Sequence, residues 1–311
     1  MGFINKLFNH NDNSKTAEDR DSLAMASKGV ENGQPQDVHA DVDSSNTSNS
    51  VKVCDYLDPR CPLSLLPFDW RIGIVRGSAA KGDDEAKALL AYYGLEEDHT
   101  VNELWGELSE AKDDDSFQKV LERIYNCTKI GHPESLFIMG VCFYEGLGVQ
   151  KDQVRGWQML QESCEGGCTS AMNQIGLLWR RSGNHDEALP YFQRAAELGD
   201  MCALHNLGNC YFYSWGVERD DKKAHELWQQ SAAMGNPDSY YTLGNSYYTG
   251  TQVEQNIPEA IRCYTYAATH TCNVQWDAVD KLVKVYRMIG DEQKSQEWKE
   301  KLQRYQKNNG Q

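Results

Sequence analysis

The chain lacks a hydrophobic run long enough to cross a membrane, because no stretch approaches the ~18 consecutive apolar residues that a spanning helix needs. It also lacks a basic start followed by an apolar run and a small-residue cleavage site, so we expect no secretory leader. Basic residues are few: 31 Lys and Arg stand against 46 Asp and Glu in 311 residues, a formal charge of −15. This balance argues against nucleic acid as a partner, since binding a phosphate backbone needs clustered Lys and Arg.

Catalytic and metal-binding motifs are also missing. The Ser, His and Asp residues form no recognisable nucleophile motif. Gly146 and Gly148 join two predicted helices, whereas a phosphate-binding glycine loop joins a strand to a helix. Cys54 and Cys61 are seven residues apart and have no second pair at zinc-ligand spacing, so they only weakly indicate a metal site. The sequence therefore predicts a non-enzymatic chain with no cofactor and no metal.

The first fifty residues differ in composition from the rest. Residues 9–50 are rich in Asn, Asp, Ser and small side chains, which cannot bury enough apolar area to offset the entropy of ordering. We predict a disordered tail over 1–50. A short amphipathic helix is possible at its start, where four apolar residues would share one face: Phe3, Ile4, Leu7 and Phe8. Residues 51–131 are interpreted as an N-terminal cap followed by degenerate repeats.

An internal repeat dominates residues 132–271. Glycine recurs at intervals of 36, 32 and 36 residues, at Gly140, Gly176, Gly208 and Gly244. Large apolar residues lie four positions before, one position before and three positions after each glycine. In a helix these positions share one face. Glycine inside a helix costs about 1 kcal/mol relative to alanine. Its recurrence therefore predicts a place where a neighbouring helix crosses too closely for a Cβ atom.

A second helix follows in each unit. Small residues mark its contact position, and a bulky side chain comes four residues later. The small residues are Gly156, Ala188, Ala224 and Ala260, and the bulky ones are Leu160, Phe192, Trp228 and Tyr264. Asp152, Asn184, Asp220 and Asn256 are expected to cap the starts of these helices. Residues 272–311 are predicted to form a terminal capping pair, with charged outward positions.

The segment from Leu207 through Gly208 and Trp215-Gly216 to Asp220, followed by Ala224 and Gly235-Asn236, resembles the Sel-one-like repeat. That family is related to the tetratricopeptide repeat. The resemblance is close over 132–271 and loose over 70–305. It implies an all-α fold, a right-handed α-solenoid of stacked antiparallel helix pairs. One branch of the family is secreted, with a disulfide in each repeat. Here only Cys142 and Cys210 are equivalent, so we expect a cytoplasmic protein with free thiols.

The resemblance also implies a binding face on the concave side, lined by the first helix of each pair. The positions three residues before, one after and four after each repeat glycine would form it. We predict partner-binding roles for Asn173, Arg180, His205, Asn209, Phe212, Tyr241, Asn245 and Tyr248. The matching positions of the first repeat hold Phe137, Val141 and Tyr144. Related tetratricopeptide grooves hold extended peptides partly through an Asn at the position of Asn209 and Asn245, since an amide both donates and accepts.

Three functional hypotheses follow. The first is a monomeric interaction scaffold or adaptor that binds a protein or peptide on the concave face. The second is a membrane-associated adaptor anchored through the amphipathic start. The third is a small-molecule-binding or hydrolytic member of the repeat family.

Overall fold

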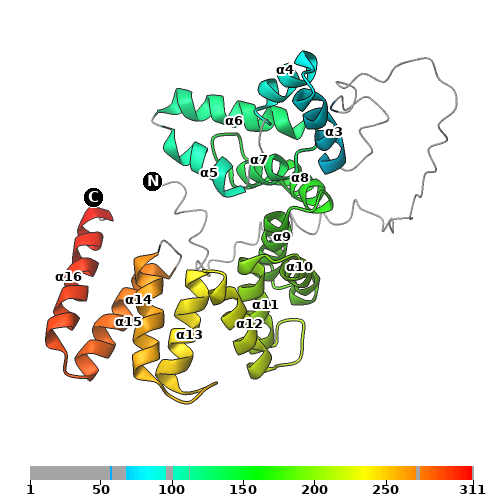
Figure 1. Ribbon diagram of the computed structural model, residues 1–311. Helices are drawn as coiled ribbons and strands as arrows, with labels where there is room; N and C mark the ends of the chain where they lie inside the picture. Colours follow the sequence, from blue (N-terminus) through cyan, green and yellow to red (C-terminus); the bar gives the residue numbers. More distant parts are fainter. Residues whose placement is uncertain (1–56, 58–67, 96–100, 112, 271–273, 310–311) are drawn as a thin grey trace. The chain divides into compact units, whose positions relative to one another are not determined.

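The computed structural model describes residues 57, 68–95, 101–111, 113–270 and 274–309. The predicted disordered tail, its amphipathic start and the first part of the predicted N-terminal cap lie outside these residues, apart from Leu57. The described residues form fourteen helices and no strand. The fold class expected from the sequence, an all-α array of stacked antiparallel helix pairs, is thereby confirmed (Figure 1).

The chain divides into two compact units, and the division falls inside helix α9 (Thr169–Arg181). The N-terminal unit runs to Gln174 and contains six helices within its described part. They are α3 (Phe68–Ala80), α4 (Asp84–Tyr93), α5 (Val101–Glu110), α6 (Asp114–Thr128), α7 (Pro133–Glu145) and α8 (Gln153–Glu165). The helices α7 and α8 form the first repeat, and α5 and α6 pack against α7.

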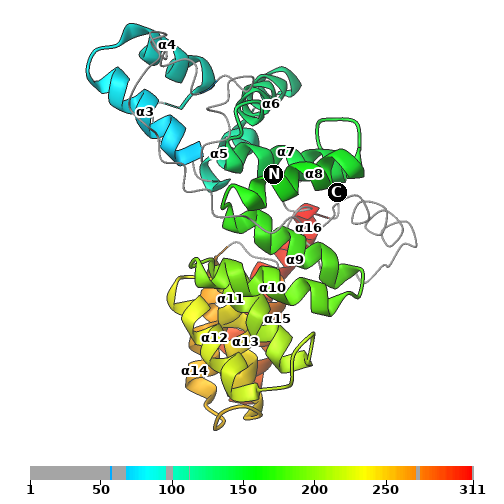
Figure 2. The same ribbon diagram turned by 90° about the vertical axis from the view of Figure 1, so that its right-hand side faces the viewer.

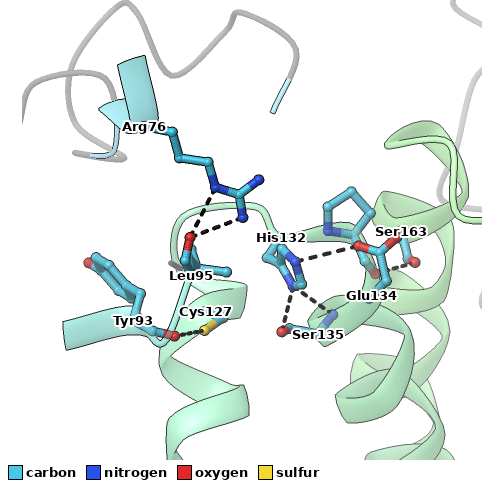
Figure 3. Close-up of polar contacts among 9 residues, drawn as sticks. Arg76, Tyr93, Leu95, Cys127, His132, Glu134, Ser135 and Ser163 are labelled. Carbon is cyan, nitrogen blue, oxygen red and sulfur yellow. Dashed lines mark hydrogen bonds and ion pairs between the residues drawn. The ribbon is translucent and has the colours of Figure 1, made fainter. Parts of the chain in front are cut away.

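Polar contacts to backbone carbonyls join the helices of the N-terminal unit (Figure 3). The guanidinium of Arg76 donates to the carbonyl oxygen of Leu95 at 3.0 Å. The thiol of Cys127 donates to the carbonyl oxygen of Tyr93 at 3.1 Å. These contacts tie α3 to Leu95, just after α4, and α6 to the last residue of α4. The region that the sequence interprets as degenerate repeats is therefore also built from packed helices.

The C-terminal unit is described from Ile175 onward and continues the array. After the end of α9 come α10 (His185–Glu197), α11 (Met201–Tyr213), α12 (Asp221–Ala233), α13 (Pro237–Thr249), α14 (Ile257–Thr269), α15 (Gln275–Met288) and α16 (Glu292–Asn309). From α10 to α16, each helix packs against the next one in the chain. Figure 1 shows these helices side by side in chain order, and in the view of Figure 2 they overlap one behind another.

The four repeat glycines lie where the two helices of a pair touch. A Cβ atom on Gly208 would lie 2.5 Å from Nε1 of Trp228, and one on Gly244 would lie 2.7 Å from Cε1 of Tyr264. A Cβ atom on Gly176 would lie 2.7 Å from Cε1 of Phe192. In the first repeat, a Cβ on Gly140 would lie 3.0 Å from Cγ of Leu160 and 3.1 Å from a backbone oxygen of the facing helix. The predicted close crossing is thus confirmed in all four repeats.

Three of the four predicted caps at the start of the second helices are present. The side chains of Asp152, Asp220 and Asn256 each accept a hydrogen bond from the backbone N–H three residues later. The prediction is wrong for Asn184, which makes no such bond. Its backbone has φ −90° and ψ 77°, away from the φ near −144° of the other three, because the loop before it is shorter.

Candidate functional site

We define the first-helix face as seven residues of the C-terminal unit: Arg180, His205, Asn209, Phe212, Tyr241, Asn245 and Tyr248. All seven side chains are half-buried. They lie on the first helices α9, α11 and α13. Helix α11 contacts α13 through the hydrogen bond between His205 and Ser239, and Arg180 of α9 contacts Trp215 in the loop after α11. Asn173 also lies on a first helix and is half-buried, but it belongs to the N-terminal unit.

The matching positions of the first repeat do not form an open face. Phe137, Val141 and Tyr144 are 8%, 4% and 4% exposed. The helix α7, which carries them, packs against α5 and α6 as well as against α8. In this repeat the three positions therefore belong to the core.

The two equivalent asparagines have different surroundings. The side-chain oxygen of Asn245 accepts a hydrogen bond from the hydroxyl of Tyr264 at 2.8 Å. Asn209 makes no side-chain hydrogen bond to another described residue, and its amide keeps contact with solvent. The partner of Asn245 is a tyrosine, whereas Trp228 stands at the matching position beside Asn209. The amide of Asn209 is therefore fully available to a ligand, and that of Asn245 is partly used.

A chain of hydrogen bonds fixes the tautomer of His205. The Ser231 hydroxyl donates to the carbonyl oxygen of Met201 at 2.6 Å, and the Ser239 hydroxyl donates to Ser231 at 2.7 Å. Ser239 has thereby used its proton, so the 2.9 Å contact requires His205 Nδ1 to donate to the Ser239 oxygen. Burial and then the charge of Arg180 lower the pKa of His205 to about 4. The neutral ring therefore keeps Nε2 as an unprotonated acceptor.

Nε2 of His205 has no protein partner among the described residues, and it is not enclosed. Asn209 comes four residues later on α11, so the two side chains are neighbours on one face of the helix. The first-helix face thus presents two neighbouring groups to a ligand: the acceptor nitrogen Nε2 of His205, and the side-chain amide of Asn209, whose donor and acceptor are both unused by the other described residues.

Arg180 is a half-buried cation with no carboxylate partner within the part of the chain that the structure describes. Its guanidinium lies over the ring of Trp215, 5.3 Å from the ring centroid. Burial lowers the pKa of Arg180 from its usual value. The contact with Trp215 holds the side chain in place but does not neutralise its charge.

Trp215 is itself held by two further rings. His185 stacks on it at a centroid distance of 5.3 Å, and Tyr213 stacks at 4.7 Å. The residue between Tyr213 and Trp215 is Ser214, whose φ of 57° lies in the left-handed region. Gly146 and Gly250 hold the matching positions in the first and fourth repeats. Trp215 and His185 were not predicted as site residues, although a tryptophan in a loop where the other repeats have Leu147 and Thr251 is a visible signal.

A second polar cluster, drawn in Figure 3, has the residue types of a catalytic triad but a capping geometry. His132 Nδ1 lies 2.8 Å from the Ser135 hydroxyl, and Nε2 lies 3.5 Å from a Glu134 oxygen. The same Nδ1 accepts the backbone N–H of Ser135 and so caps the start of α7. Ser135 is 1% exposed, and the enclosed cavity beside this cluster has room for about one water molecule. We interpret the cluster as structural.

Two other expectations concern membranes and cysteines. No helix among the described residues combines the length and the apolar character needed to cross a bilayer. The seven cysteines in the described ranges are free, and six of them are buried. Burial raises the pKa of Cys142 to about 12 and that of its equivalent, Cys210, to about 11. These thiols therefore act as small apolar core residues.

Comparison with known proteins agrees with this geometry. The family model described as "Sel1 repeat" matches residues 133–168, 169–200, 203–236 and 237–271. A solved Sel1 repeat protein from Oxalobacter formigenes is 20% identical, with 75% of this chain and 99% of that chain covered and a TM-score of 0.57. The immunity protein PA5088 from Pseudomonas aeruginosa is 19% identical, with 67% and 82% covered and a TM-score of 0.51.

A protective antigen of uropathogenic Escherichia coli, c5321, displays an SLR fold. It is 22% identical, with 73% of this chain covered and a TM-score of 0.50, and the match spans 47% of that protein. At these identities the structural matches establish the fold alone. The family model identifies four Sel1 repeats within residues 133–271 of this chain, and the structural matches agree with the fold that such repeats form.

Proposed function

We propose that the chain is a non-enzymatic, cytoplasmic scaffold that binds a segment of a partner protein on its first-helix face as a monomer. Arrays of helical repeats present extended surfaces of this kind. The bound segment is an extended peptide, which lies across α11 and α13.

One observation carries the proposal: a half-buried face offers hydrogen-bonding groups that the protein itself does not use. The Asn209 amide and His205 Nε2 have no partner within the described ranges. An extended peptide has free backbone N–H and C=O groups along its length. The amide can bond to both, and the imidazole nitrogen accepts from an N–H. Half-buried polar groups of this kind gain more from a ligand than exposed groups do.

Aromatic side chains surround these polar groups. Phe212 packs against the Trp228 ring at a centroid distance of 5.4 Å, and Tyr241 packs against Tyr264 at 5.9 Å. Each ring leaves part of its surface open. Aromatic residues that are anchored on one side and open on the other are typical of the core of protein interfaces.

The test is affinity purification of the full chain from native lysate, followed by mass spectrometry. We expect Asn209→Ala with Asn245→Ala to abolish recovery of the partner while the helical circular dichroism signal stays unchanged. Asn209→Ala alone is the cleaner variant, because Asn209 has no internal bond to lose. Gln230→Ala, on the exposed side of α12, is the matched control. Retained recovery by both asparagine variants would place the binding site elsewhere.

A further inference from the structure

We infer that Arg180 is the receptor for a carboxylate, supplied by an acidic residue of the bound segment. This inference rests on the proposed function for the identity of the segment, but the anion site itself is a property of Arg180 and its surroundings.

The first argument is the unpaired charge. Removing a charged group from water is unfavourable unless an opposite charge or hydrogen bonds compensate for it, so arginines that are largely buried are normally paired. Acidic side chains outnumber basic ones by 46 to 31 in this chain. Even so, Arg180 has no carboxylate within ion-pair distance among the described residues. Its unpartnered nitrogens are still in contact with solvent, so an anion can reach them.

The second argument is that the guanidinium is already held in position. Trp215 lies beneath it, and His185 and Tyr213 stack on Trp215. A side chain that is held in this way loses little conformational freedom when it binds. The arrangement also presents the planar group to a ligand, and planar groups suit the bidentate binding of carboxylates.

The third argument concerns the charge of the ligand. Two titratable groups that interact electrostatically with Arg180, His205 and Cys210, are both neutral near pH 7. Arg181, the second nearby cation, already has a contact of its own. A single available guanidinium matches a monoanion, whereas a phosphate dianion favours a cluster of cations. The acceptor nitrogen of His205 can in addition accept an N–H of the ligand, and an Asp or Glu residue in a peptide offers both a carboxylate and a backbone N–H.

The experiment uses NMR of the full chain to follow the Arg180 Nε–Hε resonance, assigned from the spectrum of Arg180→Gln. The probes are N-acetyl-glutamate amide, its glutamine analogue and inorganic phosphate, all at matched ionic strength near neutral pH. We expect the glutamate probe to shift the Arg180 resonance in a saturable way, and the glutamine probe to leave it in place. Arg194→Gln, which removes an exposed charge on α10, should not alter the titration.

Equal shifts with the glutamate and glutamine probes would overturn the carboxylate site. Tighter saturation by phosphate than by the glutamate probe would also overturn it, in favour of a phosphorylated ligand.

A second measurement separates this inference from the proposed function. Peptides are selected from a random displayed library on the full chain, and those that lose binding to Asn209→Ala are kept. Replacing Glu by Gln in such a peptide should weaken binding to the unaltered protein by about tenfold and to Arg180→Gln by less than about twofold. Asn209-dependent peptides with no acidic preference would refute the inference and leave the proposed function standing. If the glutamate probe shifts the Arg180 resonance but no peptide depends on Asn209, the carboxylate site is supported and the proposed peptide-binding function is refuted.

Discussion

Equivalent residues of successive repeats have different tasks in this protein. Asn209 and Asn245 occupy the same register position, yet one is free to bind and the other supports the buried Tyr264. His205 has a similar double role, because Nδ1 joins two helices while Nε2 stays open. At the scale of the residue, recognition and stability can therefore be separated by single substitutions.

Asn245→Ala should lower the free energy of unfolding of the C-terminal unit by about 1–2 kcal/mol, because the Tyr264 hydroxyl loses its acceptor. Asn209→Ala should change it by less than about 0.5 kcal/mol. Urea denaturation followed by tryptophan fluorescence measures both. Tyr264→Phe provides the check: in that background, Asn245→Ala should have a smaller effect. Additive effects would show that the hydrogen bond contributes nothing.

Stability should depend on pH through His205. Its pKa of about 4 in the folded protein lies below the value of about 6.5 in the unfolded chain, so the unfolded chain binds more protons between the two values. The contribution is fully present above about pH 6.5 and is lost as the pH falls towards 4, by up to about 3 kcal/mol. His205→Asn keeps a donor near the Nδ1 position but does not titrate. Thermal melts should therefore converge for the two proteins as the pH is lowered, and parallel pH profiles would contradict this account.

At the scale of the element, the helix pairs are defined by how closely their backbones approach. The first repeat is the tightest, because it has glycine on both helices. A Cβ atom on Gly156 would lie 2.6 Å from the backbone nitrogen of Tyr144. In the third repeat, the atom facing Gly208 belongs to the Trp228 side chain. Backbone cannot move aside as a side chain can, so the two sites differ in their tolerance of a methyl group.

We therefore expect glycine-to-alanine substitutions to differ in sign along the chain. Gly156→Ala should destabilise by about 3 kcal/mol or more and Gly208→Ala by about 1–3 kcal/mol, because both overpack a helix crossing. Gly77→Ala, in α3, meets nothing within 4 Å and should stabilise by up to about 1 kcal/mol through helix propensity. Chemical denaturation of the three variants measures the change in the free energy of unfolding that each substitution causes. A stabilising Gly208→Ala would refute the close-crossing explanation.

The helix pairs could be predicted because their signals are local and periodic: small residues at the crossings and capping residues at the helix starts. The cap at Asn184 was predicted wrongly because the shortened loop changes the backbone angles, which residue type does not reveal. The bond between His205 and Ser239 joins residues 34 positions apart in different repeats. The contact between Arg180 and Trp215 involves a loop whose sequence does not recur. These parts of the candidate site depend on packing and have no sequence period.

At the scale of the whole molecule, stability is distributed through neighbouring contacts. The helices from α10 to α16 form a continuous series in which each packs on the next. In such arrays a repeat is stable largely because its neighbours are. Damage at one crossing should therefore spread along the C-terminal unit.

Gly208→Leu is the severe test of this idea. The side chain cannot fit against Trp228, so we expect loss of hydrogen-exchange protection in α11 and α12 and also in α13 and α14. Mass spectrometry of exchanged peptides reports each helix separately. Gly77→Leu, at a position with open space, is the matched control. Loss confined to α11 and α12 would indicate independent hairpins.

The serine at position 214 has one more consequence. Its left-handed backbone is a conformation that side chains rarely adopt, and glycine at this point would relieve that strain. Glycine would also give the unfolded loop many more shapes to choose from. Serine narrows the conformations of the unfolded loop, but it disfavours the left-handed one that the folded loop adopts. The position of Trp215 therefore depends on contacts made in the folded protein, including those with His185 and Tyr213.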